Sequence, residues 1–232
     1  MNRKDRYAFV VDYFRQRQPD VTTELLFDSP FQLLVATMLS AQCTDKRINM
    51  VTPSLFQRYP DAATMASATE ADIFAYIKSV SYPNAKAKHL VTMAKQLVDD
   101  FDGVVPDNIK QLTSLSGVGR KTANVVLSVA FQQPTMAVDT HVYRVSHRLA
   151  LVPKTANTPE KVEHELVKNI PEQYISRAHH WLLLHGRYTC TSRNPKCTNC
   201  DFSTICPSST KSSSTKSPTT NTSTSKSNNE KG

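Results

Sequence analysis

The sequence predicts an all-α protein. Apolar residues recur at intervals of three and four along most of the chain, as in amphipathic helices, whereas the apolar–polar alternation of a half-buried strand is scarce. The chain has only 5 glycines in 232 residues, so Gly117 and Gly119, two positions apart, stand out. Hydrophobic residues make up 39% of the chain and its mean hydropathy is −0.40. Both values fit a globular core with a polar surface.

The expected helices can be placed in chain order. Near the N-terminus, Val10, Val11 and Phe14 belong to an amphipathic segment. Ser29 can cap a helix over 31–39, because Ser is a preferred N-cap and Pro30 suits a first helical turn. The other helices are expected from candidate caps at Asp45 and Asp107 and from apolar spacing at Ala71, Phe74 and Ile77, at Leu90, Met93, Ala94 and Leu97, at Ile109, Leu112 and Leu115, over 120–131, and at Val142, Val145 and Leu149.

Charge and hydropathy narrow the possible partners. The formal net charge of +8 is compatible with a polyanion as partner. The longest nearly apolar stretch, 33–41, is too short to span a bilayer. The N-terminus lacks the uninterrupted apolar region of a signal peptide. We therefore expect a cytoplasmic protein with no membrane partner.

The last 26 residues differ in composition from the rest. From residue 208 onward Ser and Thr dominate, and no large apolar side chain occurs. Such a segment cannot bury enough surface to offset the entropy lost on ordering. We expect residues 207–232 to form a disordered tail.

Four of the five cysteines lie together before this tail. The spacing is Cys-x6-Cys-x2-Cys-x5-Cys, formed by Cys190, Cys197, Cys200 and Cys206. Four-iron clusters take four Cys ligands from such short runs. Structural zinc also binds four thiolates, but usually as two Cys-x2–4-Cys pairs, and disulfides suit secreted, Cys-dense domains. The spacing favours an iron–sulfur cluster over zinc, with disulfides third.

Gly117, Val118 and Gly119 separate two helical patterns. Glycines permit a tight turn, and backbone N–H groups of the turn and of the following helix can then point at a phosphate. An ordinary helix–helix turn is the alternative. Lys121 falls in the first turn of the second helix, where the helix dipole and burial both lower an amine pKa. A neutral amine can form a Schiff base with a sugar carbon, although a phosphate-binding Lys fits the pattern as well.

Asp139 lies between Pro134, which ends the preceding helix, and the apolar face that begins at Val142. It is well placed as an N-cap. A carboxylate aimed into a cleft near Lys121 is the functional alternative, and one residue can do both.

At this point the chain resembles the bacterial endonuclease III family, DNA glycosylase/AP lyases of the helix-hairpin-helix superfamily. The resemblance rests on three segments and the cysteine run, in family order, and spans about residues 5–206. The segments are Leu115-Ser-Gly-Val-Gly-Arg-Lys-Thr-Ala-Asn-Val-Val126, Val138-Asp-Thr-His-Val142 and His185-Gly-Arg-Tyr-Thr-Cys190.

The resemblance implies the chemistry of the catalytic residues and the cluster. Lys121 would attack C1′ of the damaged nucleotide, and Asp139 would assist base departure and proton transfers. Cys190, Cys197, Cys200 and Cys206 would bind a 4Fe-4S cluster.

The resemblance also implies how DNA is held. Gly117, Val118 and Gly119 would grip DNA phosphate, and Gln42 would fill the gap left by the flipped base. Arg193 and Lys196, in the loop between the first two cluster cysteines, would reach the DNA backbone.

The chain departs from the family pattern in two places. Cys43 stands where Ala or Thr is expected, and we interpret it as a small buried hydrophobe. The family's Gly-Leu-Tyr-Asn wedge reads Ser81-Tyr-Pro-Asn84 here. Tyr82 aligns with the intercalating Leu, and an aromatic ring can still wedge between bases.

By resemblance the fold has two lobes. A six-helix domain with the hairpin would cover 22–132, and an iron–sulfur cluster domain would combine 1–21 with 133–206. The implied protein is a nucleoid-associated monomer acting on double-stranded DNA. It would excise oxidised or ring-saturated pyrimidines and cleave 3′ to the abasic site by β-elimination. The alternatives are an adenine-mismatch glycosylase, against which Lys121 argues, and a non-catalytic DNA-binding iron–sulfur protein.

Overall fold

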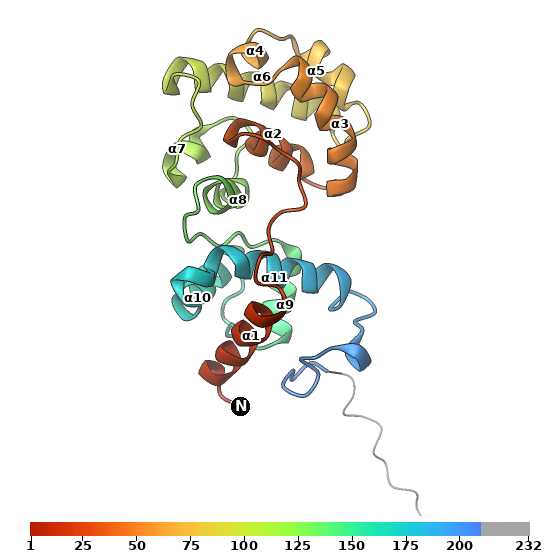
Figure 1. The fold of residues 1–232 in the computed structure, drawn as a ribbon, viewed down its shortest axis with the longest axis vertical. Coiled ribbons are helices and arrows are strands. Elements are labelled where there is room, and N and C mark those ends of the chain that lie inside the picture. The colour runs from red at the N-terminus through yellow and green to blue at the C-terminus, as the bar shows by residue number, and fades with distance from the viewer. Residues whose placement is uncertain (210–232) are drawn as a thin grey trace, which may run out of the picture.

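The computed structural model of the chain describes residues 1–209, and within them every regular element is a helix. The tail expected over 207–232 lies, from residue 210 onward, outside the described residues. The α-helices are α1 (Arg3–Arg17), α2 (Pro30–Ser40), α3 (Asp45–Arg58), α4 (Ala62–Ala66), α5 (Glu70–Ile77), α6 (Pro83–Phe101), α7 (Ile109–Ser114), α8 (Arg120–Ala130), α9 (Thr140–Arg148), α10 (Pro159–Asn169) and α11 (Ile175–Tyr188), with short 3-10 helices η1 (Glu172–Tyr174) and η2 (Cys197–Asn199) (Figure 1).

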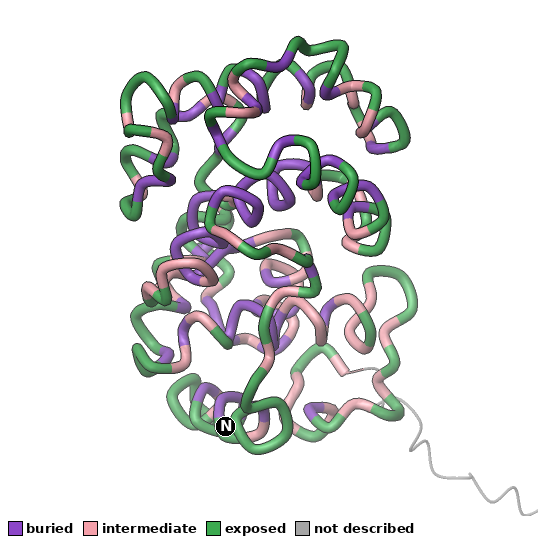
Figure 2. The backbone as a smooth tube through the Cα atoms, turned by 45° about the horizontal axis from the view of Figure 1, so that its top comes forward, coloured by how far each residue is buried: buried purple, intermediate pink, exposed green. Residues whose placement is uncertain are grey.

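The first hydrophobic core lies among α2 to α8. Helix α2 is at its centre, since every residue from Phe31 to Leu39 is buried (Figure 2). A helix that is apolar on all sides must be covered on all sides, and α3, α6 and α8 all contact it. Among residues 1–209, no helix has both the length and the apolar character needed to cross a membrane.

The second core joins the two ends of the folded chain. Helix α1 packs with α9, α10, α11 and Phe202, although α2 to α8 lie between them in the sequence. Phe14 stacks on Trp181 with ring centroids 5.6 Å apart, and the Trp181 indole N–H donates to the Gln18 carbonyl at 2.8 Å. The chain therefore crosses between the cores twice, after α1 and after α8 (Figure 1). The domain limits expected from the sequence stay a prediction.

The helix caps match the sequence expectations in part. Ser29 caps α2 by accepting from the Gln32 amide, as expected. At α3 and α7 the cap is one residue away from the expected aspartate: Thr44 caps α3 and Asn108 caps α7. Because Thr, Asn and Asp are all good N-caps, sequence alone did not distinguish the neighbours. The shift matters at α3, because it leaves the Asp45 carboxylate available for another partner.

Candidate active site

The hairpin between α7 and α8 depends on one glycine with a left-handed backbone conformation. Gly117 has a φ of +76°, a backbone conformation that residues other than glycine rarely adopt. A Cβ there would lie 2.8 Å from His89 Cβ. Gly119 is the N-cap of α8, has a φ of −87° and has open space where a Cβ would be. Val118 is buried in the first core and fixes the turn to it.

The N-terminus of α8 can receive an anion. No side chain caps it, so the first amides of the helix lack the usual acceptor. The Val118 amide is different, because it already donates to the Leu115 carbonyl at 3.1 Å. Phosphate binding would therefore use the amides of Gly119 and the first turn of α8 rather than all three hairpin amides.

Lys121 stands in that first turn and lines a cleft of about 760 Å³ between the two cores. Solvent reaches its side chain through the cleft, but protein atoms surround most of the amine. Burial lowers the pKa of Lys121, and the nearby Arg187 guanidinium lowers it further. The carboxylates of Asp139 and Asp45 raise it. The net direction is downward, which enlarges the neutral, nucleophilic fraction of the amine.

Asp139 lines the same cleft from the start of α9. Its Oδ1 accepts hydrogen bonds from the amides of His141 and Val142, both at 2.8 Å, so it is the N-cap of that helix. The second oxygen, Oδ2, has no hydrogen bond to any residue between 1 and 209. The carboxylate thus caps α9 with one oxygen and keeps the other for the cleft.

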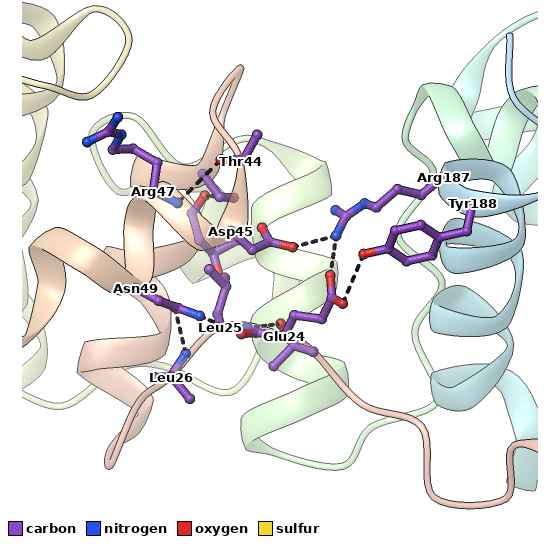
Figure 3. Close-up of polar contacts among 12 residues, drawn as sticks. Glu24, Leu25, Leu26, Thr44, Asp45, Arg47, Asn49, Arg187 and Tyr188 are labelled. Atoms are coloured by element: carbon purple, nitrogen blue, oxygen red, sulfur yellow. Dashed lines mark hydrogen bonds and ion pairs between the residues drawn. The ribbon is translucent and has the colours of Figure 1, made fainter.

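A charge cluster that the sequence analysis missed closes one side of the cleft. Arg187 of α11 reaches Asp45 at 2.8 Å and also pairs with Glu24, whose carboxylate accepts from the Tyr188 hydroxyl at 3.2 Å (Figure 3). These residues come from α3, α11 and the segment before α2. No local pattern links positions so far apart in the sequence.

Two buried histidines face the cleft beside Lys121. His179 Nδ1 lies 2.7 Å from the Ala137 carbonyl, and since a carbonyl only accepts, Nδ1 carries the proton. Burial lowers the pKa of both His179 and His180 to about 3. Both rings are therefore neutral near pH 7.

Gln42 lies at the rim of the cleft in a loop held by two contacts. Lys86 Nζ donates to the carbonyls of Leu39 and Ala41, both at 2.7 Å, and so satisfies the C-terminus of α2. The Ser81 hydroxyl donates to the Gln42 carbonyl at 2.7 Å. This bond joins the Gln42 loop to the loop of the neighbouring Tyr82.

Tyr82 is 64% exposed and has a φ of +55° at the start of α6. It lies outside the cleft lining, on the loop tied to Gln42. Arg193 and Lys196 are exposed on the loop beside the cysteines, also outside the cleft lining. The structure therefore brings Lys121, Asp139 and Gln42 into one cleft and leaves the other expected DNA contacts outside the cleft lining.

Cys190, Cys197, Cys200 and Cys206 line one small cavity at the edge of the second core. Arg148 of α9 secures its wall: its Nη1 donates to Cys190 Sγ at 3.4 Å and to the Thr191 carbonyl at 2.7 Å. Cys43 lies elsewhere, half-buried in the lining of the Lys121 cleft.

The donor set fits an iron–sulfur cluster, because four thiols from one short run line a single cavity and a four-iron cluster takes four Cys ligands. Burial raises the pKa of Cys200 and Cys206, and bound iron would stabilise their thiolates.

Comparison with known families defines the class of protein. Residues 35–172 match the family described as HhH-GPD superfamily base excision DNA repair protein. The helix-hairpin-helix of α7 and α8, with Lys121 and Asp139 in the adjoining cleft, lies within this range.

Individual relatives agree with this class. Endonuclease III of Rickettsia felis is 45% identical over 197 residues, which cover 85% of this chain and 92% of that protein. Endonuclease III of Escherichia coli K12 is 43% identical over 209 residues, covering 89% and 96%. The structure of a trapped endonuclease III–DNA covalent intermediate matches with a TM-score of 0.85 at 38% identity, over 90% of this chain and 98% of that one.

The chain belongs to the endonuclease III family within the HhH-GPD superfamily. It is accordingly a DNA glycosylase and AP lyase of base excision repair, and the family resemblance inferred from its motifs is confirmed.

The two hairpin glycines form a matched pair for substitution. Gly117→Ala should lower the free energy of unfolding by about 1–3 kcal/mol, because alanine is strained at this φ and its Cβ meets His89. Gly119→Ala should leave stability almost unchanged, since nothing lies within 4 Å of its Cβ. Urea unfolding of both variants measures the difference. Equal destabilisation by the two substitutions would contradict the hairpin geometry.

The cysteine cavity predicts a yellow-brown protein with about four irons per chain. Cys197→Ser should lose iron and visible absorption, whereas Cys43→Ser should keep both, because Cys43 lies outside the cavity. Metal analysis after anaerobic purification gives the result. Stoichiometric zinc without iron would overturn the cluster assignment.

Proposed function

We propose that this enzyme excises oxidised or ring-saturated pyrimidines from double-stranded DNA and then cuts the strand 3′ to the abasic site. The observation that carries the proposal is the shared cleft, in which the Lys121 amine, with its lowered pKa, faces the Asp139 carboxylate. Two similar solved structures are endonuclease III–DNA complexes, one covalent and one non-covalent.

The damaged nucleotide must first leave the base stack, because a base inside a duplex cannot reach the cleft. Flipping costs a few kcal/mol, and the cost is lowest for bases that stack weakly. A ring-saturated pyrimidine is no longer flat and stacks weakly, so flipping itself favours this substrate class. Gln42 would occupy the gap, and Tyr82 would wedge beside it from the loop that Ser81 ties to Gln42.

Lys121 then performs the covalent step. Its neutral amine attacks C1′, a nitrogen–carbon bond forms, and the bond from C1′ to the base breaks with its electron pair leaving on the base. The base takes up a proton. After the sugar ring opens, the nitrogen–carbon bond becomes an iminium, which makes the 2′ hydrogen acidic.

Strand cleavage is a β-elimination from this iminium. A base removes the 2′ proton, the C2′–C3′ double bond forms, and the C3′–O bond breaks, so the phosphate leaves 3′ to the site. Water hydrolyses the iminium and restores the Lys121 amine. Asp139 Oδ2, which has no hydrogen bond to another residue within 1–209, is available for these proton transfers while Oδ1 continues to cap α9.

DNA phosphate would be held at two places. Gly117, Val118 and Gly119 form the hairpin that presents the amides opening α8, and Arg193 and Lys196 offer two exposed cations near the cysteines. A 4Fe-4S cluster on the four cysteines would stabilise the loop that carries Arg193 and Lys196. We also propose that the enzyme acts as a monomer on the DNA of the cytoplasmic nucleoid.

Lys121→Gln and Asp139→Asn test the residue roles. Lys121→Gln should abolish borohydride trapping and strand cleavage on a thymine-glycol duplex and largely retain DNA binding, because only one charge is lost. Asp139→Asn should reduce base excision by several orders of magnitude and keep the fold, since Asn also caps helices. Gel shift and single-turnover cleavage measure binding and chemistry separately.

Lys168→Gln is the matched control. It removes the same charge from an exposed position on α10, outside the cleft lining, and should behave like the unaltered protein. Near-normal cleavage by Lys121→Gln would refute the lyase assignment of Lys121 and leave it as a phosphate contact.

A further inference from the structure

Arg187 holds two carboxylates at the edge of the catalytic cleft. Its Nη1 lies 2.8 Å from Asp45 Oδ2 and also pairs with Glu24 (Figure 3). The guanidinium is only 29% exposed and Asp45 only 19%, so the pair is shielded from solvent screening more than an ordinary surface ion pair. The arrangement also links α11 to α3, and hence the second core to the first.

Two of these charges, Asp45 and Arg187, act on the proposed nucleophile. Asp45, Arg187 and Lys121 all line one cleft. The Asp45 carboxylate favours the protonated form of Lys121, raising its pKa, whereas the Arg187 cation lowers it. The Asp45 carboxylate could therefore form an ion pair with the Lys121 ammonium. Arg187 already binds Oδ2 of that carboxylate.

We propose that Arg187 is a positioning residue for the reaction, because it engages the Asp45 carboxylate and so keeps it from forming an ion pair with Lys121. The inference rests on the proposed role of Lys121 as the nucleophile. An ammonium paired with Asp45 would be both protonated and drawn away from the sugar. With Asp45 bound to Arg187, the amine stays neutral in a larger fraction of molecules and can turn toward C1′.

Asp139 also raises the pKa of Lys121, and by more than Asp45 does, but Arg187 binds Asp45 and Glu24 instead. Asp139 faces Lys121 from the start of α9 as a fixed N-cap. His179 and His180 face it from α11, and since the pKa of each is about 3, both stay neutral through the neutral and alkaline range. The cleft lining further contains Glu24, Cys43, His141 and Tyr143.

A purely structural role for Arg187, as a link between the cores, makes a different prediction. Arg120 of α8 and Glu163 of α10 form a second such link at 2.6 Å. Asp45, and not Glu163, is among the charged groups that shift the pKa of Lys121. Loss of either link can loosen the cores, but only loss of Arg187 leaves an unpaired carboxylate beside Lys121.

The test is the pH dependence of single-turnover strand cleavage on an abasic-site duplex, quenched with borohydride at each pH. The holoenzyme is compared with Arg187→Gln, Arg187→Lys, Asp45→Asn, the double variant Arg187→Gln/Asp45→Asn and the control Arg120→Gln. The rate rises with pH as Lys121 loses its proton, so the midpoint of the rise reports its pKa. Cleavage by the Lys121→Gln protein is subtracted as the background.

Arg187→Gln should move the midpoint to higher pH by about one unit, because an unpaired Asp45 stabilises the ammonium. Asp45→Asn should move it to lower pH, because the stabilising carboxylate is gone. The double variant should return close to the unaltered midpoint, as expected for coupled residues. Arg187→Lys should stay near the unaltered midpoint because it keeps the charge, and Arg120→Gln should not move it.

Unchanged midpoints in Arg187→Gln and Asp45→Asn, or shifts in the same direction, would overturn the inference while leaving the Lys121 assignment intact. If the unaltered protein cleaves no faster than the Lys121→Gln protein, the proposed function is refuted instead. Circular dichroism and visible absorbance establish that each variant is folded. If Arg187→Gln does not fold, the Asp45→Asn variant alone tests the inference. The inference is refuted if the midpoint of its pH–rate profile does not move to lower pH.

Discussion

A lysine can attack carbon only after it has lost its proton, and the surroundings of Lys121, the proposed nucleophile, favour that loss. The amine needs a site that disfavours its charge and still admits a nucleotide. The cleft between the two cores provides such a site, since it is shielded by protein yet open to solvent. The uncapped start of α8 adds the positive end of a helix dipole and leaves its amides available for phosphate.

Neither core could form this cleft alone. The first core supplies Lys121, Gln42 and Asp45, and the second supplies Asp139 and Arg187. Helix α1 belongs to the second core although it precedes the first, so the chain must cross between them twice (Figure 1). The cysteine cavity lies against the second core, where Arg148 of the same helix that Asp139 caps holds Cys190. The cysteine cavity and the Asp139 carboxylate are thus joined through one short helix, α9.

Local chemistry made much of this predictable from the sequence. The helical class, the Ser29 cap, the Asp139 cap, the buried Val118 and the tight turn at Gly117 all follow from neighbouring residues. The Arg187 cluster could not be predicted, because its partners are 142 and 163 positions away. The left-handed φ of Gln42 and Tyr82 was equally hidden, because these are not glycines and their conformation depends on contacts made elsewhere by Ser81 and Lys86.

The most direct measurement of the central claim is the titration of Lys121 itself. Lysine labelled with 13C at Cε gives one NMR signal per side chain, and the Lys121→Gln protein identifies the signal of interest by its loss. We predict that this signal titrates at clearly lower pH than those of the exposed lysines outside the cleft lining, because protein atoms surround most of the amine and burial lowers the pKa of Lys121. Titration together with the exposed lysines would contradict the central claim.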